Sequence, residues 1–294
     1  MTSLEDECPH PPNLRICDWQ FLYFTTGAYK DLSIYECKTC GLKAQFPRVE
    51  QSMLYEADYY QGKAEYTYID ERETERFHKY VWDARLRNIQ KFIPTGTFLD
   101  VGSSFGGFLR AAQKKGYKVQ GVEISSYASL FAKDSGIPTV NCSLLETKFA
   151  PDSFDVITLI EVIEHLENPK LVFQELTRIL KPGGLLLLQT ANFEGWQAKD
   201  AGPSYHYYMP GHLFYYSNSV LKKILTPLGF DRFICYFGVD FSLLSKLKKS
   251  RGNFKHWYDY RHWIRISFYH FKSKLSKAGF PLTSSYVLYA FKSR

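Results

Sequence analysis

From Thr97 onwards the sequence alternates short apolar runs with amphipathic stretches, and this alternation restricts the fold more than any other feature. The runs predict strands at 98–101, 118–122, 154–160 and 185–189, with apolar segments at 230–237 and 286–291 as the last strands. Helices are predicted at 108–115, 126–135, 169–180 and 217–228, the last one starting from Ser217 or Ser219. Strands that alternate with helices form a mostly parallel, doubly wound α/β sheet covered on both faces.

Length and composition bound the number of domains and the location. The 294 residues suffice for one ordinary domain with a smaller attachment, or for two small domains, and 45% hydrophobic residues predict a packed core. The acidic start of the chain does not resemble a secretory signal, and no run of about 18 apolar residues predicts a spanning helix. The expected location is therefore the cytoplasm.

The composition changes along the chain, and four parts are expected. Residues 1–50 form a small Cys-rich module, irregular apart from a short strand at 32–36, and residues 51–93 form a helical linker. The α/β core spans residues 94–240. Residues 241–294 hold a basic aromatic helical segment and the final strand. No internal repeat is visible in the sequence.

A glycine-rich turn follows the first core strand. Asp100 lies at the end of the strand, and Gly102, Ser104 and Gly106 lie in the turn that opens the next helix. Glycines at such a turn let the backbone approach a ligand closely, although the spacing differs from the Gly-x-Gly-x-x-Gly pattern of dinucleotide sites. Glu123 ends the second strand, where a carboxylate can accept both ribose hydroxyls of an adenosine ligand. The two features together favour a ligand site over an ordinary tight turn.

These segments resemble the class I S-adenosylmethionine-dependent methyltransferases. Asp100, Gly102 and Gly106 match that family's first motif, although a serine stands where the middle glycine is usual. The resemblance implies that Glu123 binds the ribose of S-adenosylmethionine and that Ile124 packs against the adenine. The expected donor site comprises Asp100, Gly102, Ser104, Gly106, Glu123, Ile124 and Glu161.

Three later segments carry the same resemblance. Residues 154–169 resemble the fourth strand and following loop of ubiquinone-pathway and sugar-modifying methyltransferases, and residues 180–185 resemble the turn before their fifth strand. Residues 212–217 resemble a later signature of the same group. The match covers about residues 75–235 and implies a Rossmann-like sheet of seven mostly parallel strands.

One departure concerns the adenine. The family often places an Asp soon after the third strand, against the adenine amino group. This chain has Asn141 and Ser143 in that region. Either side chain, or a backbone carbonyl, is left to take that role.

Methyl transfer requires the donor and acceptor to be aligned, and some acceptors must lose a proton. His165 follows the fourth core strand, where the acceptor should approach, and an imidazole with a pKa near neutrality can act as a base. The alternative is that His165 and its neighbour cap the loop. His206 and His212 lie in the Tyr-rich loop 203–212 and are further candidates, unless this loop only packs on the sheet. Glu161 is expected to contact the donor or to orient its loop.

Four of the six cysteines lie within the first 40 residues. In a cytosolic chain such clustering indicates metal before disulfides. Cys37 and Cys40 have the spacing of half a zinc ribbon or knuckle. Cys17 with Cys8 or His10 completes the expected ligand set, which resembles the four-cysteine zinc module of related sugar methyltransferases. The alternative is a reduced remnant that binds no metal.

The positive charge is concentrated near the C-terminus. Residues 246–277 hold ten Lys/Arg and one acid, a net charge of +9, so the rest of the chain sums to −2 from the total of +7. On a continuous helix, six apolar residues would share one face: Trp257, Tyr260, Ile264, Phe268, Phe271 and Leu275. Such a helix suits peripheral contact with an anionic membrane, and the alternatives are a solvated face packed on the core or, less favoured, nucleic-acid binding.

The resemblance implies methyl transfer from S-adenosylmethionine to a small molecule. The cysteine module and the 212–217 signature favour a sugar of an envelope polysaccharide or a lipid-linked saccharide. A quinone- or phenol-type O-methyltransferase is the first alternative, supported by residues 161–169 and by the membrane affinity of the basic segment. A non-catalytic module that binds nucleic acid or protein is the second, and the intact motifs of the first two strands argue against it.

Overall fold

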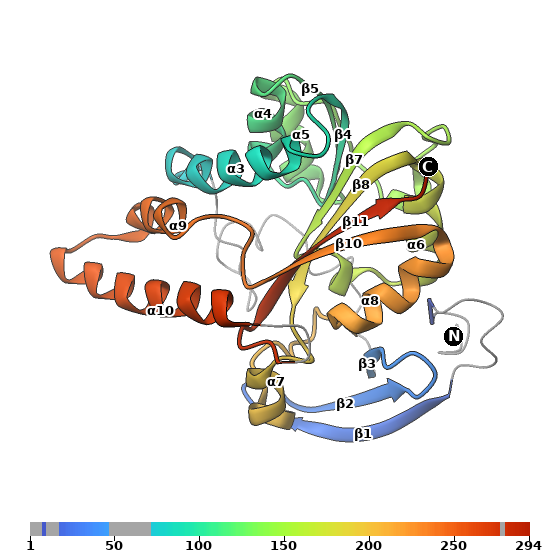
Figure 1. Ribbon diagram of the computed structural model, residues 1–294, viewed down its shortest axis with the longest axis vertical. Helices are drawn as coiled ribbons and strands as arrows, with labels where there is room; N and C mark the ends of the chain where they lie inside the picture. Colours follow the sequence, from blue (N-terminus) through green and yellow to red (C-terminus); the bar gives the residue numbers. More distant parts are fainter. Residues whose placement is uncertain (1–7, 10–17, 47–71, 277–279) are drawn as a thin grey trace.

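The computed structural model describes residues 8–9, 18–46, 72–276 and 280–294. In this part of the chain a seven-stranded sheet forms the centre of the protein, and a four-stranded sheet lies beside it (Figure 1). The strands of the larger sheet are β4 (Gly96–Val101), β5 (Tyr117–Val122), β6 (Thr139–Val140), β7 (Phe154–Ile160), β8 (Leu180–Ala191), β10 (Phe230–Phe237) and β11 (Ser285–Lys292).

The larger sheet is mostly parallel. Its order is β10-β11-β8-β7-β4-β5-β6, and only β11 pairs antiparallel, with β8 on one side and β10 on the other. The remaining pairs are parallel, so β4, β5 and β7 all end at the same edge of the sheet. The predicted Rossmann-like α/β fold is therefore confirmed.

Helices cover both faces of this sheet (Figure 1). The helices around it are α3 (Glu75–Gln90), α4 (Gly107–Lys114), α5 (Ser126–Asp134), α6 (Pro169–Ile179) and α8 (Asn218–Leu225). Alternate side chains of β8 point to opposite faces: Leu185 and Leu187 pack with α3, α4 and α5, whereas Leu186 and Leu188 pack with α6 and α8. Because β8 is buried on both faces, it reads as a continuous apolar run rather than as an alternating strand.

Local signals set the ends of these elements. Ser217 caps α8 by accepting a hydrogen bond from the backbone N–H of Val220, so it is Ser217 rather than Ser219 that fills the N-cap. The strand that follows α6 begins earlier than predicted, at Leu180 instead of Leu185. The register between β7 and β8 shifts after Phe154, which lets Pro182 and the two glycines after it lie within the strand.

The N-terminal region is more regular than the sequence indicated. β1 (Trp19–Thr26), β2 (Lys30–Cys37) and β3 (Lys43–Phe46) form an antiparallel sheet, where only one short strand was expected. Its fourth strand is β9 (Phe214–Tyr215), which comes from the α/β core and pairs with β3. The Tyr23 hydroxyl also lies 2.6 Å from that of Tyr208. The small sheet is thus joined to the loop between β8 and α8.

The basic segment forms two α-helices. α9 (Leu243–Ser250) and α10 (His262–Leu275) are separated by short 3-10 turns, and they project from the side of the sheet together (Figure 1). The Asp259 carboxylate accepts hydrogen bonds from the backbone N–H groups of Lys255 and His256, and it thereby caps the start of the 3-10 turn Trp257–Arg261. This turn continues directly into α10, so residues 257–275 form one helical run whose first part is 3-10 rather than α.

The remaining helix, α7 (Trp196–Ala201), follows β8. Of the predicted helical linker, α3 is observed, and residues 51–71 lie outside the described residues. No helix in the described part of the chain is long and apolar enough to cross a membrane.

Candidate active site

The turn between β4 and α4 has the backbone conformation that a close-packed ligand turn requires. Gly102 (φ 72°), Ser104 (φ 48°) and Gly106 (φ 74°) all lie in the left-handed region. Only Ser104 carries a Cβ there, at a cost of about 1 kcal/mol relative to glycine. The position at which the related family usually has its middle glycine is thus the position where this chain stores strain.

Glu123 lies at the end of β5, beside this turn. Its side chain is buried, and its carboxylate accepts hydrogen bonds from the backbone N–H of Ser104 (2.8 Å) and of Ser125 (2.9 Å). A carboxylate offers about four acceptor sites, so these two bonds do not prevent it from binding hydroxyl groups as well. The position fits the ribose of an adenosine ligand, as the sequence predicts.

The other expected donor residues surround this turn. Asp100 is buried, and it accepts a hydrogen bond from the Thr158 hydroxyl at 2.5 Å. Ile124 leaves half of its side chain exposed (50%), next to Glu123, where it can pack against a flat ring. Asn141 donates to the backbone carbonyls of Glu123 and Ile124, each at 2.9 Å. Its amide thus supports the tip of β5, which makes an additional role in adenine recognition less suited to it.

The loop after β7 packs directly on the glycine turn. A Cβ at Gly102 would lie 2.5 Å from a methyl carbon of Val162, so only glycine fits there. The residue before Val162 is Glu161, which is exposed and has a φ of 54°. The glycine turn and the loop after β7 are therefore adjacent, and Glu161 precedes the residue that packs on the turn.

Glu164, His165 and His212 meet beside this loop. Their ligand-type oxygen and nitrogen atoms lie within 4.8 Å of one another, and the two imidazole centroids are 4.7 Å apart. Nδ1 of His165 lies 2.7 Å from the Gly211 carbonyl oxygen, and Nδ1 of His212 lies 3.0 Å from that of Tyr207. A carbonyl only accepts, so each Nδ1 carries a proton and each Nε2 is the basic nitrogen.

Burial favours the uncharged form of each member of this group. Burial lowers the pKa of His165 to about 4, and burial with the neighbouring ring lowers that of His212 to about 3. Burial, followed by the charge of Glu161, raises the pKa of Glu164 well above its ordinary value. Neither Glu164 oxygen has a partner at normal hydrogen-bond geometry among the described residues. Two neutral imidazoles next to a carboxylic acid can receive a proton, and the same donor set would suit a divalent cation.

His206 lies apart from this group. It is exposed on the loop after α7, where its ring packs against Tyr205 and Tyr207 at centroid distances of 4.9 and 4.4 Å. Tyr207 in turn stacks on His212 at 6.3 Å. Of the three predicted histidines, the structure thus brings His165 and His212 together and leaves His206 at the surface.

The cysteines of the N-terminal sheet form a second group. The Sγ atoms of Cys8, Cys37 and Cys40 lie within 4.8 Å of one another, and those of Cys8 and Cys40 are 3.4 Å apart. Tetrahedral zinc sites place their sulfurs about 3.8 Å apart, given a Zn–S bond of about 2.3 Å. The Gly41 N–H donates to the Cys37 carbonyl at 2.7 Å, which closes a tight turn around the pair. Cys17 and His10 lie outside the described residues.

The electrostatics of the three thiols also suit a cation. Hydrogen bonds from Cys40 and Cys8 lower the pKa of the Cys37 thiol, whereas the interaction with Cys37 raises the pKa of Cys8 and raises that of Cys40 to about 12. One negative charge is thus favoured in the group, and further thiolates repel it. A Zn²⁺ ion removes that repulsion, so the residues present fit this metal.

The comparisons with known proteins agree with the fold. Residues 72–232 match the family described as "Methyltransferase domain", more than half of the chain. The chain belongs to this family, and it is an S-adenosylmethionine-dependent methyltransferase.

Curated relatives match part of the chain. The ubiquinone biosynthesis O-methyltransferase of Histophilus somni is 30% identical over 169 residues, which cover 47% of this chain and 71% of that protein. Its namesake from Paracidovorax citrulli is 32% identical over 102 residues, 32% of this chain and 43% of that protein. The chain therefore spans less than half the length of the second relative.

Solved structures show the same fold. Phosphoethanolamine N-methyltransferase 2 of Haemonchus contortus, in complex with S-adenosyl-L-methionine, superposes with a TM-score of 0.54 at 22% identity. The match covers 86% of this chain and 62% of that one. A methyltransferase from Archaeoglobus fulgidus gives a TM-score of 0.51 at 18% identity, with 74% of this chain and 97% of that one covered.

Sequence reasoning missed several residues at this edge. Glu164 was treated only as part of a loop, and Gln189, Arg85 and Tyr269 were not singled out. Glu164 follows Glu161 by one helical turn in the sequence, which is a signal that could have been used. Gln189 contacts Arg85 from 104 positions away, and no local pattern indicates such a pair.

Replacing Glu164 by Gln should change how stability depends on pH. Because the folded state raises the pKa of Glu164 above its ordinary 4.5, the unfolded chain releases this proton first as pH rises, and wild-type stability falls from there upward. The stability of E164Q relative to wild type should therefore increase between about pH 5 and pH 8, by up to about 1.4 kcal/mol per pH unit.

Urea unfolding at several pH values, with a chelator present, measures this difference. The two histidines titrate in both proteins, so their contribution cancels. Glu167→Gln, an exposed neighbour, is the control and should track the wild type. A difference between E164Q and wild type that does not change with pH would show that Glu164 is ionised in the folded protein.

Proposed function

We propose that this methyltransferase modifies a hydroxyl group on a small apolar acceptor, that the acceptor is a phenol or quinol, and that His165 is the base. The observation that carries the proposal is the imidazole pair of His165 and His212 at the loop after β7, whose pKa values burial lowers. S-adenosylmethionine supplies a methyl group already activated by its sulfonium. The work left to this chain is to bind the acceptor, exclude water and receive a proton.

The weak basicity of the pair favours an acidic hydroxyl. Burial lowers the pKa of His165 to about 4. A phenol loses its proton near pH 10, so the transfer to such an imidazole is uphill by about six pKa units. An aliphatic hydroxyl resembles water, with a pKa near 15.7, and the same transfer is uphill by about twelve units. Proton transfer to this imidazole is therefore less unfavourable from a phenol than from a sugar hydroxyl.

Aromatic side chains near the imidazole pair also suit a ring. Tyr207 stacks on His212, and the core cluster of Tyr205, Tyr208 and Phe193 lies on the same loop between β8 and α8. Aromatic side chains gain from edge or stacked contact with a flat acceptor. The curated relatives named as ubiquinone biosynthesis O-methyltransferases support the same acceptor class.

A sugar or lipid-linked saccharide is the second candidate. The thiol group of Cys8, Cys37 and Cys40 supports it, because the N-terminal zinc module resembles that of sugar methyltransferases. We propose that zinc binds these thiols as a structural ion, with Cys17 as the fourth ligand. The three thiols belong to the same buried cluster as Leu213 and Leu221 of the core, so the ion would fix the small sheet to the acceptor loop.

The outer side of α10 and of the turn before it supports an apolar or lipid-borne acceptor. The six residues expected to share a face are all exposed: Trp257 (85%), Tyr260 (41%), Ile264 (74%), Phe268 (57%), Phe271 (56%) and Leu275 (50%). Between 243 and 275 the segment carries nine Lys/Arg and one acid, a net charge of +8. We propose that it docks on an anionic membrane surface, on the cytoplasmic side.

Zinc content tests the proposed thiol site. Protein purified without chelator should hold about one zinc per chain, and C37S and C40S should lose both the metal and several kcal/mol of stability. Cys142→Ser, outside the group, is the control and should keep the metal. Less than about 0.2 zinc per chain in the wild type would reject the site.

Vesicle sedimentation tests the proposed membrane surface. The double variant I264S/F268S should bind vesicles of phosphatidylglycerol at least about tenfold more weakly, because two exposed apolar side chains no longer enter the interface. The matched control replaces two exposed leucines elsewhere, Leu130 (61%) and Leu171 (46%), with Ser. Binding by the wild type should weaken as salt rises. Equal binding of both double variants would contradict the proposal.

The acceptor and the base are tested together with isotope-labelled S-adenosylmethionine and a host extract, divided into lipid, small-molecule and macromolecular fractions. The wild type should label the lipid fraction, in products that carry an O-methylated phenol. His165→Ala should slow the transfer at least about a hundredfold while leaving the affinity for S-adenosylhomocysteine unchanged. Loss of that affinity would assign His165 to the donor site, and label in saccharides would select the second candidate.

A further inference from the structure

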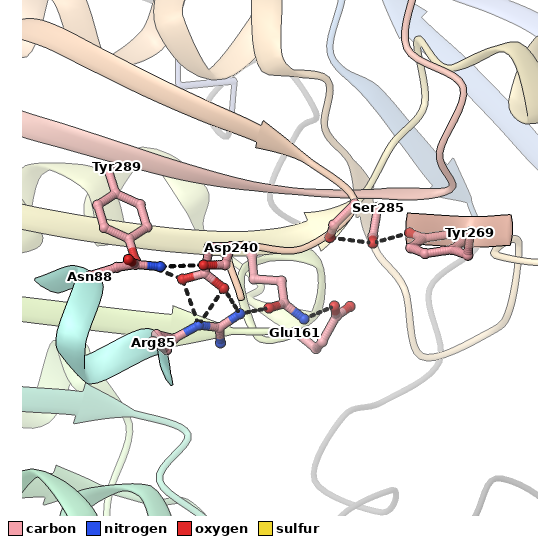
Figure 2. A network of polar contacts seen from close by, with 9 residues as sticks. Arg85, Asn88, Glu161, Asp240, Tyr269, Ser285 and Tyr289 are labelled. Carbon is pink, nitrogen blue, oxygen red and sulfur yellow. Dashed lines mark hydrogen bonds and ion pairs between the residues drawn. The ribbon is translucent and has the colours of Figure 1, made fainter. Parts of the chain in front are cut away.

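A chain of polar contacts runs from the interior of the protein to Glu161 (Figure 2). It starts at Arg85 of α3 and Asp240, which follows β10. Nε of Arg85 lies 3.0 Å from each Asp240 carboxylate oxygen, and one terminal guanidinium nitrogen lies 2.8 Å from Oδ1. Such a bidentate pair fixes the plane of the guanidinium as well as its place.

This ion pair is buried and is held by hydrogen bonds from several elements. The side chains of Arg85 and Asp240 are 5% and 0% exposed. The Tyr289 hydroxyl donates to the Asp240 carboxylate at 2.6 Å, and the Asn88 side-chain amide donates to its backbone carbonyl. Helix α3, the loop after β10 and strand β11 therefore all hold the pair. A buried charge with this many partners has little freedom to move.

Gln189 links the buried ion pair to Glu161 and fixes the orientation of its carboxylate. A guanidinium has only donors, so the amide oxygen of Gln189 must face Arg85, and it lies 2.5 Å from a guanidinium nitrogen. The amide nitrogen then faces the other way and donates to Oε1 of Glu161 at 2.6 Å. The backbone N–H of Glu161 donates to the Gln189 carbonyl at 2.9 Å. Gln189 thus holds Glu161 by both its backbone and its side chain.

Glu161 needs this support. Its φ of 54° lies in the left-handed region, which costs a non-glycine residue about 1 kcal/mol. The carboxylate is exposed, at the edge where β7 meets the glycine turn. A strained, exposed residue held by a buried network is a frequent feature of functional sites.

The aromatic groups around Glu161 suit the acceptor proposed above. Its negative charge contributes, after burial, to the raised pKa of Tyr207 and Tyr269, so both phenols lie within its field. Tyr269 belongs to α10, and its hydroxyl lies 2.8 Å from that of Ser285 on β11. Figure 2 shows Glu161 extending from the Arg85 end of the network, with Tyr269 and Ser285 beyond it.

We propose that Gln189, Arg85 and Asp240 are positioning residues, and that the carboxylate they orient, Glu161, is a catalytic residue that binds the acceptor hydroxyl. Glu161 accepts a hydrogen bond from this hydroxyl and turns its oxygen toward the donor methyl. As the C–O bond forms and the C–S bond of the donor breaks, the hydroxyl proton moves along this hydrogen bond to the Glu161 carboxylate and passes from there to His165. This inference rests on the proposed function, and it places Glu161 on the acceptor side of the site.

The test replaces Gln189 by Met, which keeps the length of the side chain and removes both of its hydrogen bonds. The rate of transfer into the wild type's labelled fraction, at saturating extract, should fall at least about tenfold. Affinity for S-adenosylhomocysteine should stay within about twofold of wild type, as should all readouts of the matched control Q120M, a partly buried glutamine of β5 in the same sheet.

A double variant distinguishes a positioning role of Gln189 from general damage to the structure. If Gln189 acts through Glu161, then Q189M/E161Q should be no slower than E161Q alone. Rate losses that multiply in the double variant, or an unchanged rate in Q189M, would overturn the proposal. An equal loss of S-adenosylhomocysteine affinity in E161Q would place Glu161 on the donor instead.

A third measurement needs no acceptor, so it holds if the wild type labels no fraction and the proposed function fails. Crystal structures of wild type and Q189M with S-adenosylhomocysteine compare the place of the Glu161 carboxylate. It should move by about 1 Å or more in Q189M, a shift large enough to impair alignment. An unmoved carboxylate would refute the positioning role whatever the acceptor is.

Discussion

The buried ion pair between Arg85 and Asp240 is the contact on which the arrangement of this protein depends. Leaving either charge alone in the interior would cost about 3–5 kcal/mol, so the elements that carry them must assemble together. These elements are α3, which precedes the sheet in the chain, and the loop after β10, which follows most of it. The pair therefore closes the fold around β8 and β11, and the orientation of Gln189 at the end of β8 follows from it.

The sequence predicted the central sheet well because its signals are local. β7 has the predicted bounds, and β4 and β5 differ from prediction by one or two residues at one end. Apolar runs bounded by glycine and capping residues suffice for this result. In the small N-terminal sheet, the pairing of β3 with β9 could not be predicted, because β9 lies far away in the sequence and a distant partner leaves no local pattern. The helical path is interrupted between α9 and the 3-10 turn Trp257–Arg261, whose start Asp259 caps, and apolar periodicity does not predict this interruption.

In the candidate site, too, the sequence predicts some features and leaves others to the structure. Asp100, Gly102, Gly106 and Glu123 lie together at one edge of the sheet, as their places at strand ends predict, and their contacts with the donor stay predictions. For His165 and His212 the sequence supplied the residues and the structure supplied their environment. Desolvation lowers the pKa of both and raises that of Glu164, and no sequence pattern reveals how much water a fold removes.

Helix α10 has a different environment on its two sides. Tyr269 points inward to Ser285 and lies in the field of Glu161, whereas Phe268, next to it in the chain, is 57% exposed with Ile264 and Phe271. Successive side chains on a helix point about 100° apart, so neighbours can serve two surfaces. A membrane that receives the outer side would bring its interface within one helix diameter, about 10 Å, of Tyr269. An acceptor with a lipid tail could then present its ring to Glu161 while the tail stays in the bilayer, which is why the docking surface and the phenolic acceptor support each other.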